Sequence, residues 1–427
     1  MLLKLAKYYF SLHYWQRASI EHVKKMQIKK FRTIFEYARE NSAFYKEFYA
    51  KHGVLNLRIE SFDDIKKVPI INKNILKQYD INDIVTCKLT ENHNIHSTSG
   101  STGEPFQIAY SKYEDYSAHV RLTKYIMKHG YNPFKKMVLL SRYEPGHKFE
   151  VEEDVGFIGK LQKIFRIFPK EVISIFEPLD VIIEKLIKSK PFIIWSTPSF
   201  IHLLALELER RNQKLKIPVC FLMAETISPK QFKLFQERVC KKVIDAYGCM
   251  EAPSIGFSTN SIDYKNIVHN TFLTEVINPR EVNSAKVGDI VITNFINKTM
   301  PFIRYELGDY VGILDEDIFP SKKIGKVYGR FEDILDLGNG NTLSFHQTYQ
   351  LFHGFHEVEQ YKFIQTPYYE IILQLRINPE YEKEDVINKA LSIWNKYYPQ
   401  KDLKIEIVEK FDIDTKTGKF KVLEKLK

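Results

Sequence analysis

Cysteine is scarce in this sequence of 427 residues, which contains four cysteines and no pair at the spacing Cys-x-x-Cys. This usage argues against a disulfide framework and against a cysteine-rich zinc site, and it favours a reducing, cytoplasmic setting. His93, His96, His269 and His353 show no zinc-ligand spacing either. We therefore assign no zinc site.

Long apolar runs are also missing, since no stretch approaches the ~20 residues that a membrane-spanning helix needs. The first ten residues are basic and apolar but lack a sustained hydrophobic region and a small-residue cleavage site, so we do not expect a signal peptide. Residues 1–15 could form an interfacial helix, although a helix packed on the protein's own core is the favoured interpretation. We expect at most a peripheral membrane contact.

A nucleic-acid-binding motif is absent as well. The formal net charge is +10, but the 63 lysines and arginines are dispersed among 53 acidic residues. This pattern argues against a nucleic-acid partner and favours an anionic substrate or surface. Phenylalanine and tyrosine are abundant, with 30 and 25 residues, and most of them are expected in the core.

What is present indicates an α/β protein of more than one domain. Residues 1–60 read as helices, and buried strands are predicted at residues 137–140, 192–195, 219–223 and 243–246, alternating with helices. Such alternation is typical of a parallel sheet. After residue 330 a β-α-β pattern predicts a separate small domain. We therefore expect a large α/β domain at residues 1–329 and a small, mobile α+β domain at residues 330–427.

One stretch is unusually rich in hydroxyls and glycine: Ser97-Thr98-Ser99-Gly100-Ser101-Thr102-Gly103-Glu104-Pro105-Phe106. Glycines let consecutive backbone N–H groups turn toward one anion, and the hydroxyls add donors. The stretch is not the phosphate loop of nucleotide triphosphatases, because no Gly-Lys-Ser/Thr follows. It is interpreted as a phosphate cradle, with a plain surface turn as the alternative.

Polar loops follow Ile95, Trp195, Met223 and Ala246, each at a predicted strand end. Ligands of parallel sheets bind beyond the carboxyl ends of the strands. These loops are therefore predicted to converge.

Four further motifs follow the Ser/Gly stretch, the last of them in two parts. They are Met223-Ala224-Glu225-Thr226, Asp245-Ala246-Tyr247-Gly248-Cys249-Met250-Glu251, Met300-Pro301-Phe302-Ile303-Arg304-Tyr305-Glu306-Leu307-Gly308-Asp309, and Gly329-Arg330-Phe331-Glu332-Asp333 with Thr417-Gly418-Lys419-Phe420. Alone, each is weak. Glu225 could simply be an acid at a helix N-terminus, Arg304 a structural ion-pair partner and Lys419 a solvated charge.

As an ordered set, these motifs resemble the adenylate-forming superfamily, and specifically its phenylacetate–coenzyme A ligase-like branch with the capsular-polysaccharide enzymes of CapK type. The resemblance covers nearly the whole chain. It implies a fold of adenylate-forming type and an ATP-dependent ligase that activates a carboxylic acid as an acyl-adenylate with release of pyrophosphate. The acyl group then passes to a thiol, such as coenzyme A (CoA), or to an amine. A role in capsular or surface polysaccharide synthesis is one possibility that the CapK likeness raises.

The resemblance also implies residue roles. The phosphate loop contributes Ser99, Gly100, Ser101, Thr102 and Gly103, and the adenine is bordered by Ala224 and Glu225 and covered by Tyr247, which Gly248 follows. Asp309 would accept from the ribose hydroxyls, Glu251 would ligate Mg²⁺, Arg330 would lie near ribose and phosphate, and Lys419 would reach the α-phosphate and the acyl carboxylate.

One position departs from the family pattern. Met250 stands where the family has a threonine whose hydroxyl contacts phosphate. Three alternatives therefore stay open: an amide-forming enzyme, an adenylyl-transfer ligase that stops at AMP transfer, and a degenerate non-catalytic scaffold of the same fold. No CoA-binding signature is visible, and the sequence carries no prediction of the acid, the acceptor or the oligomeric state.

Overall fold

The computed structural model describes most of the chain as two compact units. Described are residues 1–97, 106–141, 169–282, 285–314, 322–330, 335–338, 341–343, 348, 351–352, 355, 357–411 and 420–426, without the side chains of residues 2, 15, 16, 282, 330, 341 and 342. The first unit contains residues 1–135, 161–169 and 244–327, and the second contains residues 136–160, 170–243 and 328–427. The predicted boundary at residue 330 stays a prediction.

The first unit begins with helices, as the sequence predicted. They are α1 (Leu2–Arg17), α2 (Ile20–Asn41), α3 (Ala43–Lys51), α4 (Phe62–Lys67), α5 (Lys73–Leu76), α6 (Ile81–Ile84) and α7 (Lys112–Lys128). Serine hydroxyls begin α2 and α3: Ser19 accepts from the His22 N–H and Ser42 from the Tyr45 N–H. Aromatic side chains from α2 and α3 are fully buried in the core of this unit.

Antiparallel strands complete the first unit. They are the pair β1 (His93–Ser97) and β2 (Gln107–Ser111), the run β10 (Phe272–Val282), β11 (Ala285–Asn294) and β12 (Tyr305–Gly312), and the run β8 (Gly256–Thr259), β9 (Tyr264–Ile267) and β13 (Lys323–Gly325). Strand β7 (Cys240–Tyr247) contributes Ile244–Tyr247, which pairs with β8. Strand β14 (Val327–Arg330) follows at the end of this unit.

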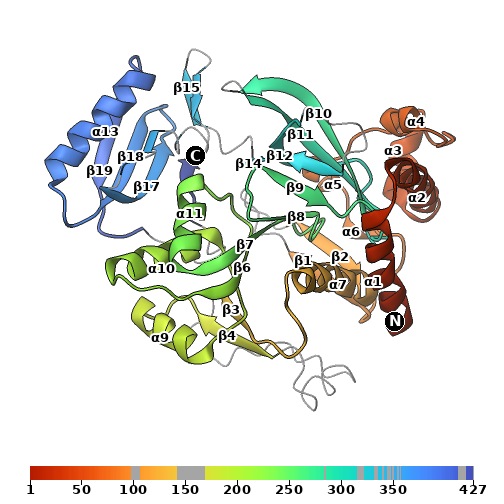
Figure 1. Cartoon of the computed structure of the whole chain (residues 1–427). Helices are drawn as coiled ribbons and strands as arrows, with labels where there is room; N and C mark the ends of the chain where they lie inside the picture. Colours follow the sequence, from red (N-terminus) through yellow and green to blue (C-terminus); the bar gives the residue numbers. More distant parts are fainter. Residues whose placement is uncertain are drawn as a thin grey trace. The chain divides into compact units, whose positions relative to one another are not determined.

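The second unit contains the predicted parallel sheet. Strands β3 (Met137–Ser141), β4 (Lys170–Ser174), β5 (Ile193–Ser196) and β6 (Ile217–Met223) run parallel in the order β4-β3-β5-β6. Their residues are largely apolar and buried, as expected for strands covered on both faces. Helices α9 (Leu179–Ser189), α10 (Pro198–Arg210) and α11 (Pro229–Arg238) lie beside these strands (Figure 1).

The C-terminal part of the second unit has a core of its own. It contains the pair β15 (Leu335–Gly338) and β16 (Asn341–Leu343), the sheet of β17 (Val358–Gln365), β18 (Ile371–Ile377), β19 (Leu403–Ile407) and β20 (Leu423–Lys425), and helix α13 (Lys383–Tyr397). The parallel pair β18 and β19 flanks α13, which confirms the predicted β-α-β pattern. Helix α13 buries Val386, Ala390 and Trp394 at helical spacing.

One prediction about the architecture was wrong. The segment before the Ser/Gly stretch was expected to end a strand of the parallel sheet, but β1 pairs antiparallel with β2 in a separate two-stranded sheet. The reason is local, because residues 98–105 connect two strands short enough to form a hairpin. The Ser/Gly stretch itself lies outside the described residues.

Candidate active site

A tight turn follows the end of strand β7, where Tyr247 is succeeded by Gly248. A Cβ atom at Gly248 would lie 2.6 Å from the Ser254 nitrogen and 3.0 Å from the Ala252 oxygen, so no larger residue fits without a backbone shift. Cys249 and Ala252 exchange backbone N–H···O bonds of 3.2 Å in each direction. The glycine thus lets the chain fold back directly after Tyr247.

Tyr247 contacts a carboxylate from a distant part of the sequence. Its hydroxyl donates to Oδ2 of Asp309 at 2.8 Å. Asp309 lies in β12 at an irregularity of the β11–β12 register, beside Gly308, whose φ of +80° favours glycine. Such bulges re-aim side chains. Two predicted nucleotide-binding residues are therefore direct neighbours.

Glu251, the predicted metal ligand, is 8% exposed. The Tyr305 hydroxyl donates to its Oε1 at 3.1 Å. Tyr305 also comes from β12, four residues before Asp309, so this strand holds a partner for each of the two predicted residues that follow β7. The Tyr110 hydroxyl donates to the Met250 carbonyl oxygen and so ties β2 to the same loop.

The surroundings of these carboxylates are negative in character. Burial, together with the charges of Glu251 and Asp309, raises the pKa of the Cys249 thiol well above its usual value. Burial and the neighbouring Cys249 and Glu251 likewise raise the pKa of Tyr110. Both groups are therefore neutral at physiological pH, and the site attracts cations and hydroxyl donors.

Met250, which departs from the family pattern, has 41% of its surface exposed. Its backbone carbonyl serves the loop, whereas its thioether contributes no hydroxyl. Among the described residues no group of three or more His, Cys, Asp or Glu side chains is placed to hold a metal ion. A Mg²⁺ ion here would need phosphate oxygens beside the protein's carboxylate, which is how Mg²⁺ is usually bound.

Arg304 has a structural role, the alternative weighed from the sequence. It is buried with φ of +47° and forms a two-point ion pair with Glu275, at 3.0 Å from Nε to Oε1 and 2.8 Å from Nη2 to Oε2. Its Nη1 donates to the carbonyl oxygens of Lys66 and Val68, at 2.6 Å each. Arg304 thus fixes the start of β12, from which Tyr305 and Asp309 extend.

Glu225 and Ala224 lie in the second unit, directly after β6. Ala224 has φ of +75°, a left-handed conformation that is unusual for a residue with a side chain. The Glu225 carboxylate accepts from the Ser199 N–H at 2.8 Å and from the Ser199 hydroxyl at 2.9 Å, at the first turn of α10. The loops after Trp195 and Met223 therefore meet, as predicted, and Glu225 is an acid at a helix N-terminus, although at that of α10.

The remaining predicted site residues are not placed by the structure. Ser99, Gly100, Ser101, Thr102, Gly103 and Lys419 lie outside the described residues. The backbone of Arg330 ends β14, but its side chain is not described. Their roles stay predictions. The sequence interpretation missed Tyr110, Tyr305 and Ser199 as partners of the site, although Tyr305 and Ser199 stand inside or beside the quoted motifs.

Comparisons with known proteins agree with this arrangement. No protein-family model matches the chain. The phenylacetate–coenzyme A ligase of Pseudomonas putida is 23% identical over 333 residues, which cover 75% of this chain and 73% of that protein. Protein CapK of Staphylococcus aureus is 24% identical over 385 residues, covering 86% and 81%.

Solved structures agree in fold. A crystal structure of 2-hydroxyisobutyryl-CoA ligase, in the postadenylation state with 2-HIB-AMP, matches with a TM-score of 0.71 at 17% identity, over 90% of this chain and 86% of that one. The predicted fold class is thereby confirmed. The chain is a relative of the adenylate-forming ligases of the phenylacetate–coenzyme A ligase-like group, as its ordered motifs predicted.

Proposed function

We propose that this protein is an AMP-forming ligase, which joins a carboxylic acid to the α-phosphate of ATP, releases pyrophosphate and passes the acyl group to a thiol. The observation that carries the proposal is the pairing of Tyr247 with Asp309 and of Tyr305 with Glu251. Two separate motifs supply one member of each pair, and both relatives and fold point to the same chemistry.

The chemistry of these residues fits ATP and Mg²⁺. The Asp309 carboxylate can accept from two ribose hydroxyls at once, and the Tyr247 ring beside it offers a flat face for adenine. The buried Glu251 carboxylate offers the hard oxygen that Mg²⁺ prefers. Bound Mg²⁺ would neutralise phosphate charge, while the protein's own residues orient the nucleotide.

Three further groups complete the proposal. Ser99, Gly100, Ser101, Thr102 and Gly103 would donate to the β- and γ-phosphates, and Arg330 would lie near ribose and α-phosphate. The Lys419 ammonium would offset the charge that develops at the α-phosphate during adenylation. Residues 330–427 would turn as a small domain between adenylation and acyl transfer.

Coenzyme A is the acceptor we propose, because the relatives named phenylacetate–coenzyme A ligases cover about three-quarters of the chain. An amine acceptor in surface-polysaccharide synthesis is the second candidate. The observation that favours it is the wider coverage of the chain by CapK, 86%.

The test is pyrophosphate release with ATP and Mg²⁺ across a panel of aryl, fatty and sugar-linked carboxylic acids. We expect release that depends on one acid class and falls strongly in Lys419→Ala. The exposed Lys410 in the same C-terminal part supplies the matched control, and Lys410→Ala should retain activity. CoA or amines added to the productive acid then identify the acceptor.

Two results of this test would count against the proposal. If no acid releases pyrophosphate and calorimetry detects no ATP binding, the protein is a scaffold of the same fold. If AMP becomes attached to the acid but no thiol or amine takes up the acyl group, the protein is an adenylyl-transfer ligase.

A further inference from the structure

Helix α1 has two apolar faces, and one of them is used by the protein's own fold. Leu5, Tyr8 and Leu12 are buried. The Tyr8 hydroxyl shares a 2.6 Å hydrogen bond with Thr271 Oγ1 and accepts from Arg121 of α7 at 3.1 Å. Figure 1 shows α1 beside α7, with which it packs. This face confirms that α1 packs on the protein's own core.

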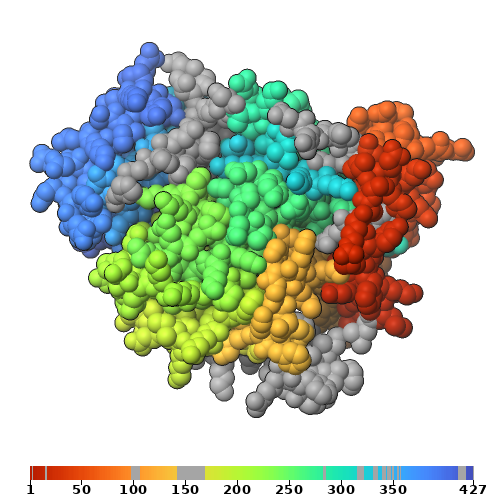
Figure 2. Space-filling model, in the orientation of Figure 1, coloured from red at the N-terminus to blue at the C-terminus, as the bar shows by residue number. Residues whose placement is uncertain are grey.

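The opposite face is apolar and exposed. Leu3, Phe10 and Tyr14 have 80%, 70% and 57% of their surface exposed, and the 3.6-residue period of a helix aligns them along one side. Figure 2 shows this N-terminal segment, in red, on the surface of the molecule. A helix that is apolar all round is usually buried on all sides. The exposed face of α1 therefore lacks a partner among the described residues.

The charges on this helix have one sign. Residues 1–20 contain Lys4, Lys7, Arg17 and His13 but no aspartate or glutamate, and the first acidic residue, Glu21, lies in the first turn of α2. Lys7 and Arg17 lie on the exposed side with Leu3, Phe10 and Tyr14, since they follow the same helical spacing. Basic and aromatic residues on one helix face are typical of helices that lie in the interface of an anionic membrane.

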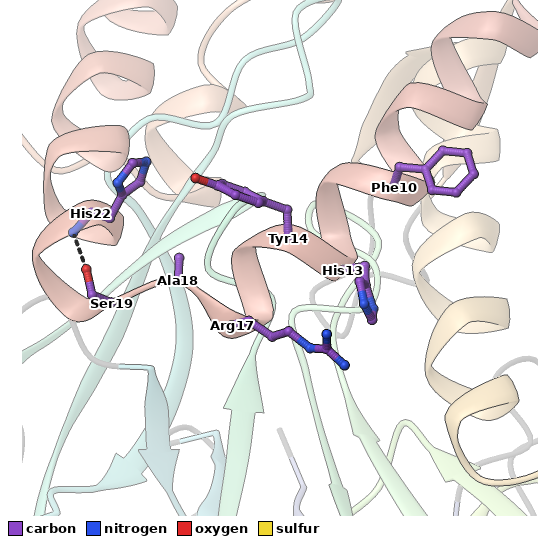
Figure 3. A pocket seen from close by; sticks show the side chains of 7 residues that line it. All are labelled: Phe10, His13, Tyr14, Arg17, Ala18, Ser19 and His22. Atoms are coloured by element: carbon purple, nitrogen blue, oxygen red, sulfur yellow. Dashed lines mark hydrogen bonds between the residues drawn. The ribbon is translucent and has the colours of Figure 1, made fainter.

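A pocket opens on this face where α1 turns into α2. It is lined by Phe10, His13, Tyr14, Arg17, Ala18, Ser19 and His22. Figure 3 shows the Tyr14 ring directed toward His22, and His13 and Arg17 extending from the same side of α1. Tyr14 and His22 lie edge to face, with ring centroids 6.0 Å apart.

Positive charge surrounds this pocket, and no carboxylate lines it. The Lys322 ammonium donates to the carbonyl oxygen of Ala18 at 2.9 Å and adds a cation at the pocket's edge. Among the residues that the structure describes, Arg17 makes no hydrogen bond or ion pair. A phosphate group would satisfy the Arg17 guanidinium and the Lys322 ammonium together.

We propose that the outer face of α1 is a docking surface for an anionic phospholipid membrane, with Leu3, Phe10 and Tyr14 inserted at the level of the headgroups and one lipid phosphate held in the pocket beside Arg17. Charge complementarity selects this occupant over a second copy of the chain, because two α1 faces of like charge would repel each other. Each copy carries Lys4, Lys7 and Arg17 with no acid within the helix. The interaction is independent of the ligase activity proposed above.

The experiment is co-sedimentation of the full-length protein with two kinds of vesicle, phosphatidylcholine alone and phosphatidylcholine mixed with phosphatidylglycerol. We expect binding to the anionic vesicles, weaker binding at high salt, and little binding to the neutral ones. The double variant Leu3→Ser with Phe10→Ser should lose at least about tenfold in affinity, because both side chains leave the interface. Arg17→Gln should lose about fivefold.

The matched control is Phe134→Ser, which removes an equally exposed aromatic residue, 74% exposed, from a loop of the same unit. It should bind anionic vesicles as the wild type does, and thermal melting should show that all variants are folded. Equal loss in Phe134→Ser, or no binding of the wild type to anionic vesicles, would overturn the proposal. Sedimentation velocity completes the test, since a dimer abolished by Phe10→Ser without vesicle binding would assign the face to a second copy.

Discussion

The Tyr247 hydroxyl donates to Oδ2 of Asp309 at 2.8 Å, across 62 positions of sequence. One residue ends β7 and the other lies at the irregularity in β12. Since a phenol and a carboxylate form a charge-assisted hydrogen bond, the pair holds the Asp309 carboxylate in one place before any nucleotide arrives. Preorganisation of this kind lowers the ordering cost of binding.

Substitutions at this pair separate its two proposed functions. Tyr247→Phe keeps the ring and should retain most ATP affinity, while the free energy of unfolding falls by about 1 to 2 kcal/mol because a hydrogen bond to a carboxylate is lost. Asp309→Asn should weaken ATP binding by about tenfold or more, because an amide accepts less strongly from the ribose hydroxyls. Calorimetric titration with ATP measures both. Wild-type affinity in Asp309→Asn would remove this residue from the nucleotide site.

The ion pair of Arg304 with Glu275 should govern stability. Burial raises the pKa of Glu275, and the Arg304 guanidinium opposes that rise. Arg304→Met leaves a buried carboxylate without its partner and should lower the free energy of unfolding by about 3 to 5 kcal/mol. The double variant Arg304→Met with Glu275→Leu should lose less than the two single variants combined, because no unpaired charge remains. Urea denaturation measures these values, and additive losses would argue against the pair.

Glu225 should stabilise helix α10. Glu225→Gln keeps the shape of the side chain but removes the charge beside the first turn, so the free energy of unfolding should fall by about 1 kcal/mol. The control is Glu184→Gln, an exposed glutamate on α9. Thermal unfolding of both variants tests the point. An equal, negligible change in the two would mean that the Glu225 contact with Ser199 contributes nothing to stability.

His202 predicts how stability depends on pH. Its Nε2 lies 3.4 Å from the Glu359 carbonyl oxygen, and burial lowers its pKa from 6.5 to about 4. The unfolded chain therefore binds a proton near pH 6.5, whereas the folded one does so near pH 4, so stability is lost as the pH falls through this window. The loss from this residue is at most about 3 kcal/mol.

The measurement is urea denaturation at several pH values for the wild type and for His202→Gln. The variant should show a shallower decline between pH 6.5 and about 4, since the residue that must be buried neutral is gone. Parallel curves for the two proteins would contradict the assignment.

Much of the fold could be predicted from the sequence because it depends on local patterns. The apolar strands and helix α13 have clear periodicity, and Asn72 does cap α5 by accepting from the Ile75 N–H, as expected. The antiparallel pairing of β1 with β2 was missed, because short strands reveal their partners only through long-range pairing. Strands β17 and β20 were missed for the same reason.

The site was predictable only in part. The motifs identified Tyr247, Glu251 and Asp309, but not that Tyr305 donates to Glu251 or that Glu225 binds Ser199. Those contacts depend on the β12 register and on the adjacency of two strand-end loops, and neither is encoded within one motif. Arg304 illustrates the reverse case, since a motif residue turned out to be structural.

The central claim, that a carboxylic acid is activated by attack on the α-phosphate, is tested most directly with an acid labelled by heavy oxygen in its carboxylate. When the acyl group passes to the acceptor, one carboxylate oxygen must remain on the AMP that is released. Mass spectrometry of the nucleotide should therefore find AMP that carries one heavy oxygen atom. Heavy oxygen in inorganic phosphate together with ADP, or AMP without label, would contradict the account.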